Sequence, residues 1–211
     1  MWLVFARSFQ THLVSVLGYD KDEAKQICAA AKPRYRSIIR GLPTFEKQDR
    51  FTINIVNCAL FSSILLSLPT LPSLEEATTY YAESMMGGAM RWFCRMSGRR
   101  KFTEADYATM RDTAALRAAD RNPYSWNMDF LPYPDGTGYE ARFTSCGICT
   151  LMGELGLFDL VGAMCHLDYT MSEASGVSEF VRRHTLAAGG PYCDCGYRKT
   201  KASGHGERWQ G

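Results

Sequence analysis

The chain has 211 residues, of which 46% are hydrophobic, and this is enough to bury one sizeable core. Its 24 basic and 22 acidic residues leave a net charge of +2, which gives no electrostatic reason to expect nucleic acid or an anionic membrane as a partner. We therefore expect one compact unit that binds a small molecule, with assembly into a homo-oligomer left open.

The N-terminal segment, residues 1–18, lacks the basic start, apolar centre and small-residue cleavage site of a secretory signal, so it is predicted to be a helix. The most apolar run, residues 53–68, is shorter than a typical membrane span and is interrupted by Asn and Ser. A buried helix is expected there. Together these features predict a cytoplasmic protein without a membrane segment.

Helical periodicity dominates the first half of the chain. Helices are predicted at about residues 20–31, 51–67 and 74–96, and Pro33 is expected to stop the first of them. On the third helix, apolar side chains at three- and four-residue steps are predicted to face the core. This stripe consists of Leu74, Ala77, Tyr81, Met85, Ala89, Trp92 and Met96.

Two helix starts carry the pattern of a capping box, in which a hydroxyl and an acid satisfy free N–H groups. They are Ser73 with Glu76, and Thr103 with Asp106. We expect a helix to begin at each.

Alternating patterns in the second half predict two β-hairpins. The first joins residues 126–130 to 139–143, and the second joins 180–186 to 192–198 through a Gly-rich turn. A helix is expected between them, at residues 147–175. The predicted fold class is α+β, with N-terminal helices packed on a small antiparallel sheet made of the two hairpins.

A single α+β domain is predicted over residues 1–199. Residues 1–101 form its helical part, and residues 102–199 form a part rich in Cys and Asp. The last residues, 200–211, have little to bury and are expected to be a disordered tail.

Eight cysteines without a secretory signal are expected to be reduced, because the cytoplasm keeps thiols unpaired. Three of them are scattered through the first half of the chain. The other five crowd into the second half: Cys146, Cys149, Cys165, Cys193 and Cys195.

Cys146 ends a predicted strand and precedes a helix, where free N–H groups lower the pKa of a thiol and favour a nucleophile. A small buried cysteine at a tight turn is the alternative. Cys165 and Asp168 share one face of a continuous helix, so both could enter one pocket, and His166 would then point elsewhere.

Strand alternation places Cys193 and Cys195 on one face and Asp194 on the other. In the preceding strand, Arg182 or Arg183 could hold a substrate carboxylate through a bidentate pair, although most such arginines are solvated.

No cofactor is expected, but a structural zinc or iron–sulfur site is an alternative. Its ligands would be Cys146, Cys149, Cys165 and Cys193. The spacing of Cys193 and Cys195 on a strand fits such sites poorly. Dinucleotide-binding, P-loop, zincin and serine-hydrolase motifs do not occur, so those classes have no support.

Four segments are similar to segments of the L-2-amino-thiazoline-4-carboxylic acid hydrolase family, in order and in approximate spacing. They are residues 122–126, 143–149, 164–169 and 189–194. By this resemblance, five positions match the family's recurring pattern and are candidate catalytic residues: Cys146, Cys165, Asp168, Cys193 and Asp194. Cys149, Cys195 and His166 look particular to this chain.

The resemblance implies hydrolytic opening of a cyclic isothiourea to a carbamoyl-cysteine. Cys146 or Cys193 would be the nucleophile, and Asp168 would hold the amidine-like nitrogens and move a proton. Arg182 or Arg183 would bind the substrate carboxylate, and Trp126 would line the substrate site.

Two other functions remain open. One is a small-molecule-binding or sensor domain without catalysis, because the Gly-Gly-x-x-Cys element also resembles V4R-type ligand-binding domains. The other is a protein with a structural zinc or iron–sulfur site. A thiol of depressed pKa would favour the enzyme.

Overall fold

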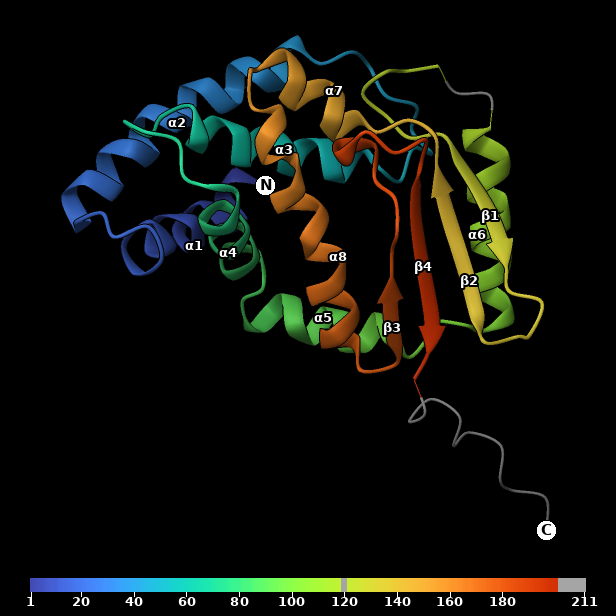
Figure 1. Cartoon of the computed structure of the whole chain (residues 1–211). Coiled ribbons are helices and arrows are strands. Elements are labelled where there is room, and N and C mark those ends of the chain that lie inside the picture. The colour runs from blue at the N-terminus through green and yellow to red at the C-terminus, as the bar shows by residue number, and fades with distance from the viewer. Residues whose placement is uncertain (119–120, 201–211) are drawn as a thin grey trace. The chain divides into compact units, whose positions relative to one another are not determined.

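The computed structural model describes residues 1–118 and 121–200 (Figure 1). Within these ranges the chain forms helices and a single antiparallel sheet, which confirms the α+β class. None of the described helices is both long enough and apolar enough to cross a membrane. The helices are α1 (Trp2–Ser15), α2 (Lys21–Gly41), α3 (Thr52–Leu65), α4 (Leu74–Met85), α5 (Gly88–Gly98), α6 (Glu104–Arg117), α7 (Gly147–Glu154), η1 (Phe158–Leu160), α8 (Val161–Ser175) and η2 (Leu186–Ala188).

The chain divides into two compact units, each made of several segments. The first unit comprises Met1–Gly87, Arg121–Trp126 and Cys146–Leu167. The second unit comprises Gly88–Asp120, Asn127–Ser145 and Asp168–Gly211. Neither boundary falls at residue 101, where the sequence placed the end of the helical part. That residues 1–199 behave as one domain stays a prediction. Of the expected disordered tail, residues 200–211, all but Thr200 lie outside the described range.

The first unit is built around α3, which packs against α2 and α7. The expected buried helix is confirmed, because every side chain from Cys58 to Leu65 is buried. Phe61 of α3 meets three aromatic rings of α1 and α4, with ring centroids 4.7 to 6.4 Å apart. The hydroxyl of Tyr80 donates to the carbonyl of Phe9 at 3.1 Å, so the polar end of this buried ring is satisfied.

Two predicted helix boundaries in the first unit are wrong. Pro33 does not stop α2, which continues to Gly41. A proline removes the hydrogen bond to the carbonyl four residues earlier, here that of Ala29, and Ala29 is exposed, so water can take its place. The predicted helix over 74–96 breaks after Met85 at the pair Gly87-Gly88, because glycine is a weak helix former.

This break changes the predicted apolar stripe. Its first half, in α4, is buried at Ala77, Tyr81 and Met85. Its second half, in α5, is not, and Trp92 is 64% exposed. The cap at Ser73 is confirmed as a full capping box, whereas at Thr103 the hydroxyl accepts as predicted but the acid binds a different N–H group.

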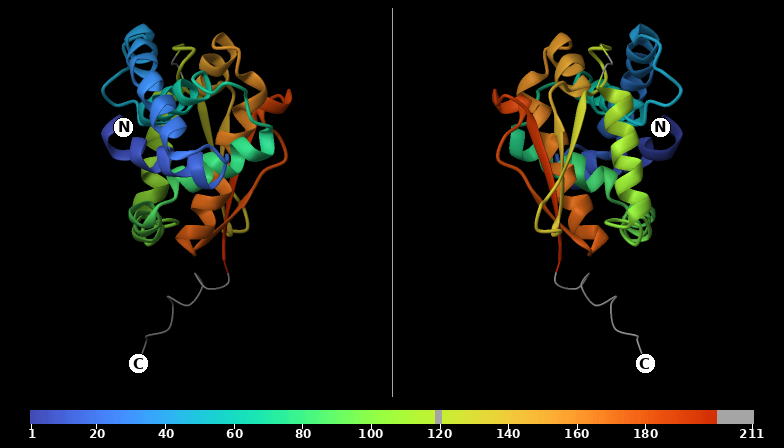
Figure 2. Two further views of the ribbon diagram at one scale, coloured as in Figure 1. Left: turned by 90° about the vertical axis from the view of Figure 1, so that its left-hand side faces the viewer. Right: turned by 90° about the vertical axis from the view of Figure 1, so that its right-hand side faces the viewer.

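The second unit contains the sheet, with strands β1 (Met128–Pro132), β2 (Gly138–Phe143), β3 (Ser178–Val181) and β4 (Cys193–Lys199). All pairs are antiparallel and the order is β1-β2-β4-β3. Helix α6 packs on β1, as the views in Figure 2 show. The sheet has two short edges, because β3 has 4 residues and β1 has 5 and ends in proline.

The two faces of the sheet differ in polarity, as expected for an antiparallel sheet covered on one side. Aromatic rings gather on one face, where Tyr197 lies between Tyr139 and Phe180 in register and meets both rings edge-on or tilted. The other face carries charges, including the ion pair between Arg142 and Glu140.

The hairpins form as predicted, but two connections differ. Strand β3 ends at Val181 rather than residue 186, and the link to β4 contains the short helix η2. The helix predicted over 147–175 is interrupted after α7 by Gly156, whose φ of +70° is a left-handed conformation that ends helices.

Candidate functional site

Cys146 is the N-cap residue of α7, as the sequence predicted, and its side chain is partly exposed. Its thiol makes no conventional cap hydrogen bond. As a thiolate it is favoured by the thiol of Cys149, by the backbone N–H groups of Cys149 and Ile148, and by the indole of Trp126. These donors outweigh burial and lower the pKa of Cys146 to about 7. We call Trp126, Cys146, Ile148 and Cys149 the Cys146 cluster.

The start of α7 is held in place by the loop before β1. A Cβ atom on Gly147 would lie 2.1 Å from the carbonyl oxygen of Tyr124, so only glycine allows this close approach. The hydroxyl of Tyr124 also donates to Glu154 at 2.6 Å, at the other end of α7. The loop and the helix therefore fix each other.

Trp126 is positioned by its neighbours in the first unit. Its ring lies 5.5 Å from that of Phe51, and the adjacent Ser125 donates to the buried carboxylate of Asp49 at 2.5 Å. Sequence reasoning proposed Trp126 as a substrate-binding residue, and this stays a prediction. The structure places the Trp126 indole beside the Cys146 sulfur. Sequence reasoning missed Asp49, which carries no local motif.

A second group of functional side chains lies in the second unit. The guanidinium of Arg182 contacts the carboxylate of Asp168 and donates to the sulfur of Cys195 at 2.9 Å. Arg182 is well buried, with a side chain that is 7% exposed, while that of Asp168 is 40% exposed. We call these residues, with Lys101 and Tyr197, the Asp168 cluster.

The helix α8 positions Asp168 in this unit. In the residues of α8 that follow Asp168, the ring of Tyr169 meets that of Phe180 in β3 edge-on at 4.7 Å. The hydroxyl of Ser172 donates to the carbonyl of Ser178 at 2.9 Å. These contacts align the last two turns of α8 with β3, and Arg182 follows β3 directly.

Burial and charge oppose each other in the Asp168 cluster. Burial raises the pKa of the Asp168 carboxyl, and Arg182 and Lys101 limit the rise. Burial also raises the pKa of Cys195 to about 12, despite the nearby guanidinium. Cys195 is therefore a neutral thiol at ordinary pH and a poor nucleophile.

Lys101 is a residue that sequence reasoning missed. Its ammonium lies 3.3 Å from the ring centroid of Tyr197, with the rings of Tyr139 and Phe102 5.6 and 5.8 Å away. Burial lowers the pKa of Lys101 to about 8. Its position in the run Arg99-Arg100-Lys101 suggests only a solvated surface, so no local signal could have found it.

A cavity of about 230 Å³ opens beside Lys101 within the second unit. Lys101, Asp106, Asp168 and Tyr197 line it, together with several serines. The carboxylate of Asp106 is already bound by the hydroxyl of Tyr139 and the N–H of Phe102. The volume of the cavity lies somewhat below the roughly 300–1,000 Å³ of typical ligand pockets.

A family model for L-2-amino-thiazoline-4-carboxylic acid hydrolase matches residues 71–197, which is more than half of the chain. The chain belongs to this hydrolase family. The match begins in front of α4, so it includes more of the helical part than the resemblance in the sequence suggested. No curated protein and no solved structure matches the chain.

The hydrolase family's model spans both clusters, and the structure groups the predicted residues accordingly. Cys146 lies in the first unit, whereas Asp168 and Arg182 lie in the second. Cys165 is in the first unit, three residues before Asp168 on α8. Their catalytic roles stay predictions.

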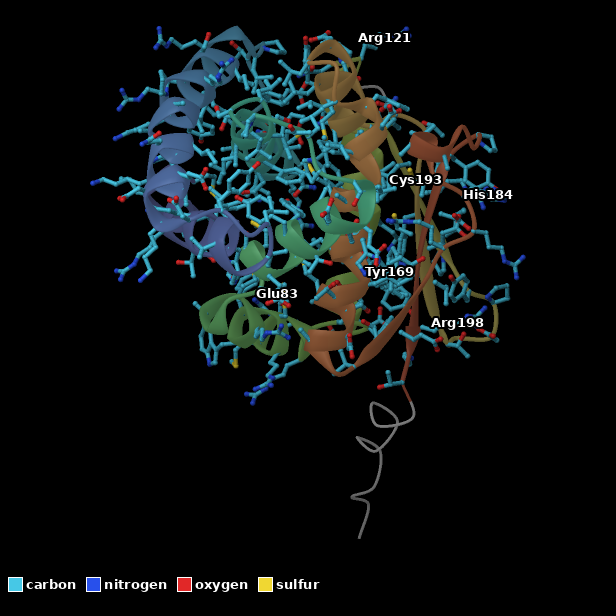
Figure 3. The ribbon with its side chains drawn as sticks, turned by 60° about the vertical axis from the view of Figure 1, so that its left-hand side comes forward. Glu83, Arg121, Tyr169, His184, Cys193 and Arg198 are labelled. Carbon is cyan, nitrogen blue, oxygen red and sulfur yellow. The ribbon has the colours of Figure 1, made fainter. Side chains whose placement is uncertain are left out.

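Cys193 and Asp194 begin β4. Cys193 is buried, and its sulfur accepts from the backbone N–H of Leu186 at 3.2 Å. The carboxylate of Asp194 accepts the backbone N–H groups of Arg183 and His184 at 2.6 to 3.0 Å, so it holds the link between β3 and β4. Figure 3 shows Cys193 and His184 near one end of the strand and Arg198 toward the other.

The metal alternative has no geometric support in the described part of the chain. There, no three His, Cys, Asp or Glu side chains come together as ligands of a metal ion.

Arg183, the other predicted carboxylate binder, has an exposed side chain.

Proposed function

We propose that this family member is a hydrolase that opens a small cyclic amidine-like ring, with Cys146 as its nucleophile. The observation that carries the proposal is the placement of the Cys146 sulfur at the start of α7, facing the indole of Trp126 and the thiol of Cys149. With its pKa lowered to about 7, this thiol is roughly half thiolate at neutral pH, and the thiolate is the reactive form.

The chemistry follows from the ring that the family's name implies. The Cys146 thiolate adds to the ring carbon that bears the amino group, and the bond from this carbon to the ring sulfur breaks. The ring sulfur leaves and takes a proton. Water then adds to the same carbon, the bond to Cys146 breaks, and a carbamoyl-cysteine is released with the thiolate regenerated.

The neighbours of Cys146 have distinct roles in this proposal. The Cys149 thiol stands where it can give a proton to the leaving ring sulfur and recover one from water. The Trp126 indole N–H stabilises the thiolate between turnovers, so we assign it positioning rather than substrate binding.

A second candidate function is small-molecule binding in the second unit. The cavity beside Lys101 favours it, because the two carboxylates there are already bound while no described residue accepts a hydrogen bond from Lys101. Lys101 is therefore a better candidate than Arg182 to bind a ligand carboxylate, because the guanidinium of Arg182 is already held by Asp168 and Cys195.

The test uses reduced, purified full-length protein and L-2-amino-thiazoline-4-carboxylate, with ring opening followed by mass spectrometry. Cys146→Ser is expected to lose roughly 100-fold or more of the turnover number, as removal of a nucleophile does. Cys28→Ser, a buried cysteine elsewhere in the first unit, is the matched control and keeps its activity. Full turnover in Cys146→Ser would overturn the assignment, whereas ligand binding without turnover would favour the second function.

A reducing compartment suits this chemistry, because a thiolate nucleophile is lost on oxidation. We therefore propose the cytoplasm as the location.

A further inference from the structure

Two partly exposed cysteines stand on the first turn of α7. Cys146 is the N-cap residue, and Cys149 is the third residue of the helix. Residues three apart on a helix lie on the same face. The thiol of Cys149 also donates to the sulfur of Cys146. The two sulfurs therefore face each other at the surface of the first unit.

We propose that Cys146 and Cys149 form a reversible dithiol–disulfide pair that exchanges with small-molecule disulfides. The Cys146 thiolate attacks one sulfur of the disulfide, whose S–S bond breaks, and the departing thiolate takes up a proton. Cys149 then loses its proton and attacks the Cys146 sulfur of the mixed disulfide, which releases the second small thiol. Two electrons pass from the protein pair to the small disulfide, which ends as two thiols.

The backbone at this turn can accommodate the bond. Helical neighbours three apart have Cβ atoms about 5–6 Å apart, while a disulfide needs about 3.5–4.5 Å. Cys146 precedes the helix in an extended conformation, with φ of −143° and ψ of 112°. The sulfurs can therefore approach by adjusting the N-cap residue, without breaking the hydrogen bonds inside α7.

Four of the other cysteines do not compete with this pair. Cys58 and Cys195 are buried, and burial raises the pKa of each thiol, so neither is a thiolate at neutral pH. Cys28 and Cys94 are also buried, and burial raises their pKa values as well. Cys146 combines partial exposure with a thiolate and an adjacent second thiol, which is what exchange requires.

A regulatory consequence rests on the proposed function. If Cys146 is the hydrolytic nucleophile, its disulfide with Cys149 removes that nucleophile, and oxidation stops ring opening until a thiol restores the pair. The exchange reaction itself does not depend on hydrolysis.

The experiment equilibrates full-length protein with mixtures of reduced and oxidised glutathione, quenches with acid, alkylates free thiols and measures intact mass. The wild type is expected to form one internal disulfide that loses two alkylation sites. Cys149→Ser should instead accumulate one glutathione adduct, mapped by peptide mass to Cys146. Cys146→Ser should react at least roughly 10-fold more slowly than wild type. Cys165→Ser, which alters another partly exposed cysteine, should form the internal disulfide as the wild type does.

Two results would overturn the pair: no internal disulfide in oxidised wild type, or an equally fast disulfide in Cys146→Ser. Far-ultraviolet circular dichroism confirms that each variant is folded. Ring opening is then assayed in oxidised and re-reduced wild type. Activity that is lost and regained supports the regulatory role, activity that persists in the disulfide form refutes it, and a pair that forms in a protein without turnover contradicts only the proposed function.

Discussion

Arg182 contacts the carboxylate of Asp168 with the same guanidinium that reaches the sulfur of Cys195. One cation thus joins an acid of α8 to a thiol of β4. The sequence predicted that this carboxylate moves a proton during ring opening, and on that prediction Asp168→Asn abolishes turnover while the protein still unfolds cooperatively. The assignment of the proton to Cys149 instead predicts that the variant keeps its turnover.

The same variant has a limited cost in stability. Loss of one partner of a fully buried pair costs about 3–5 kcal/mol, but the Asp168 side chain is 40% exposed and water screens part of the interaction. A loss of about 1–2 kcal/mol in the free energy of unfolding is expected from urea titration. Retained turnover in Asp168→Asn would remove this residue from the mechanism.

The reactivity of Cys146 should depend on pH in a defined way. Its pKa is lowered to about 7, so the thiolate is present above this pH and is lost as the pH falls through it. Alkylation of Cys146 by iodoacetamide, measured by peptide mass against pH, should have its midpoint near this value, compared with about 8.5 for a free cysteine.

Trp126→Phe should move this midpoint upward, because it removes the indole donor while keeping an aromatic ring against Phe51. Cys149→Ser is the companion variant, since the Cys149 thiol is the largest influence that favours the thiolate. An unchanged midpoint in both would show that the helix start alone sets the pKa.

Lys101 should make stability rise with pH over a specific interval. Its pKa is lowered to about 8 by burial, so above this pH the folded protein releases a proton that the unfolded chain keeps up to about 10.4. The unfolded state then binds more protons, and stability increases with pH. Below about pH 8 both states hold the proton and the cost of burying the charge is fully present.

Lys101→Met should abolish this rise. Between pH 7.5 and 9.5 the wild type is expected to gain about 1–2 kcal/mol relative to the variant, as the shift of each pKa unit is worth about 1.4 kcal/mol. Urea unfolding of both proteins at each pH measures the difference, in which the titration of other groups cancels. If the free energies of unfolding of the two proteins changed with pH in parallel, the Lys101 ammonium would be solvated in the folded state.

Gly147→Ala should destabilise the protein more than most glycine-to-alanine changes do. Its Cβ would fall 2.1 Å from the carbonyl oxygen of Tyr124, which belongs to the backbone and cannot swing away. We expect a loss of about 2–4 kcal/mol in the free energy of unfolding. Gly87→Ala, where nothing lies within 4 Å of the added carbon, is the matched control and should have little effect. Equal stability of the two variants would contradict the close packing of the loop on α7.

The sequence predicted those features that depend on local patterns. Alternation located the two hairpins, and the capping pattern located the start of α4 at Ser73. The position of Cys146 before a helix suggested a thiol of lowered pKa only as one of two readings, beside a small buried cysteine at a tight turn. Each of these follows from residues that are near neighbours in the chain.

Contacts between distant segments could not be predicted in this way. The ring cage around Lys101 depends on residues from β2 and β4, and the pairing of Arg182 with Asp168 depends on the register between α8 and β3. The breaks at Gly87 and Gly156 were missed because the apolar periodicity continues across them, although the glycines themselves were visible.

The short edges of the sheet bear on how this chain could assemble. An exposed strand invites another copy to pair with it, but β3 offers only 4 residues and β1 closes with Pro132, which has no N–H to donate. Extension of the sheet from one copy into the next is therefore disfavoured at both margins. If the chain forms a homo-oligomer, we expect side chains of its helices, rather than shared backbone ladders, to hold the copies together.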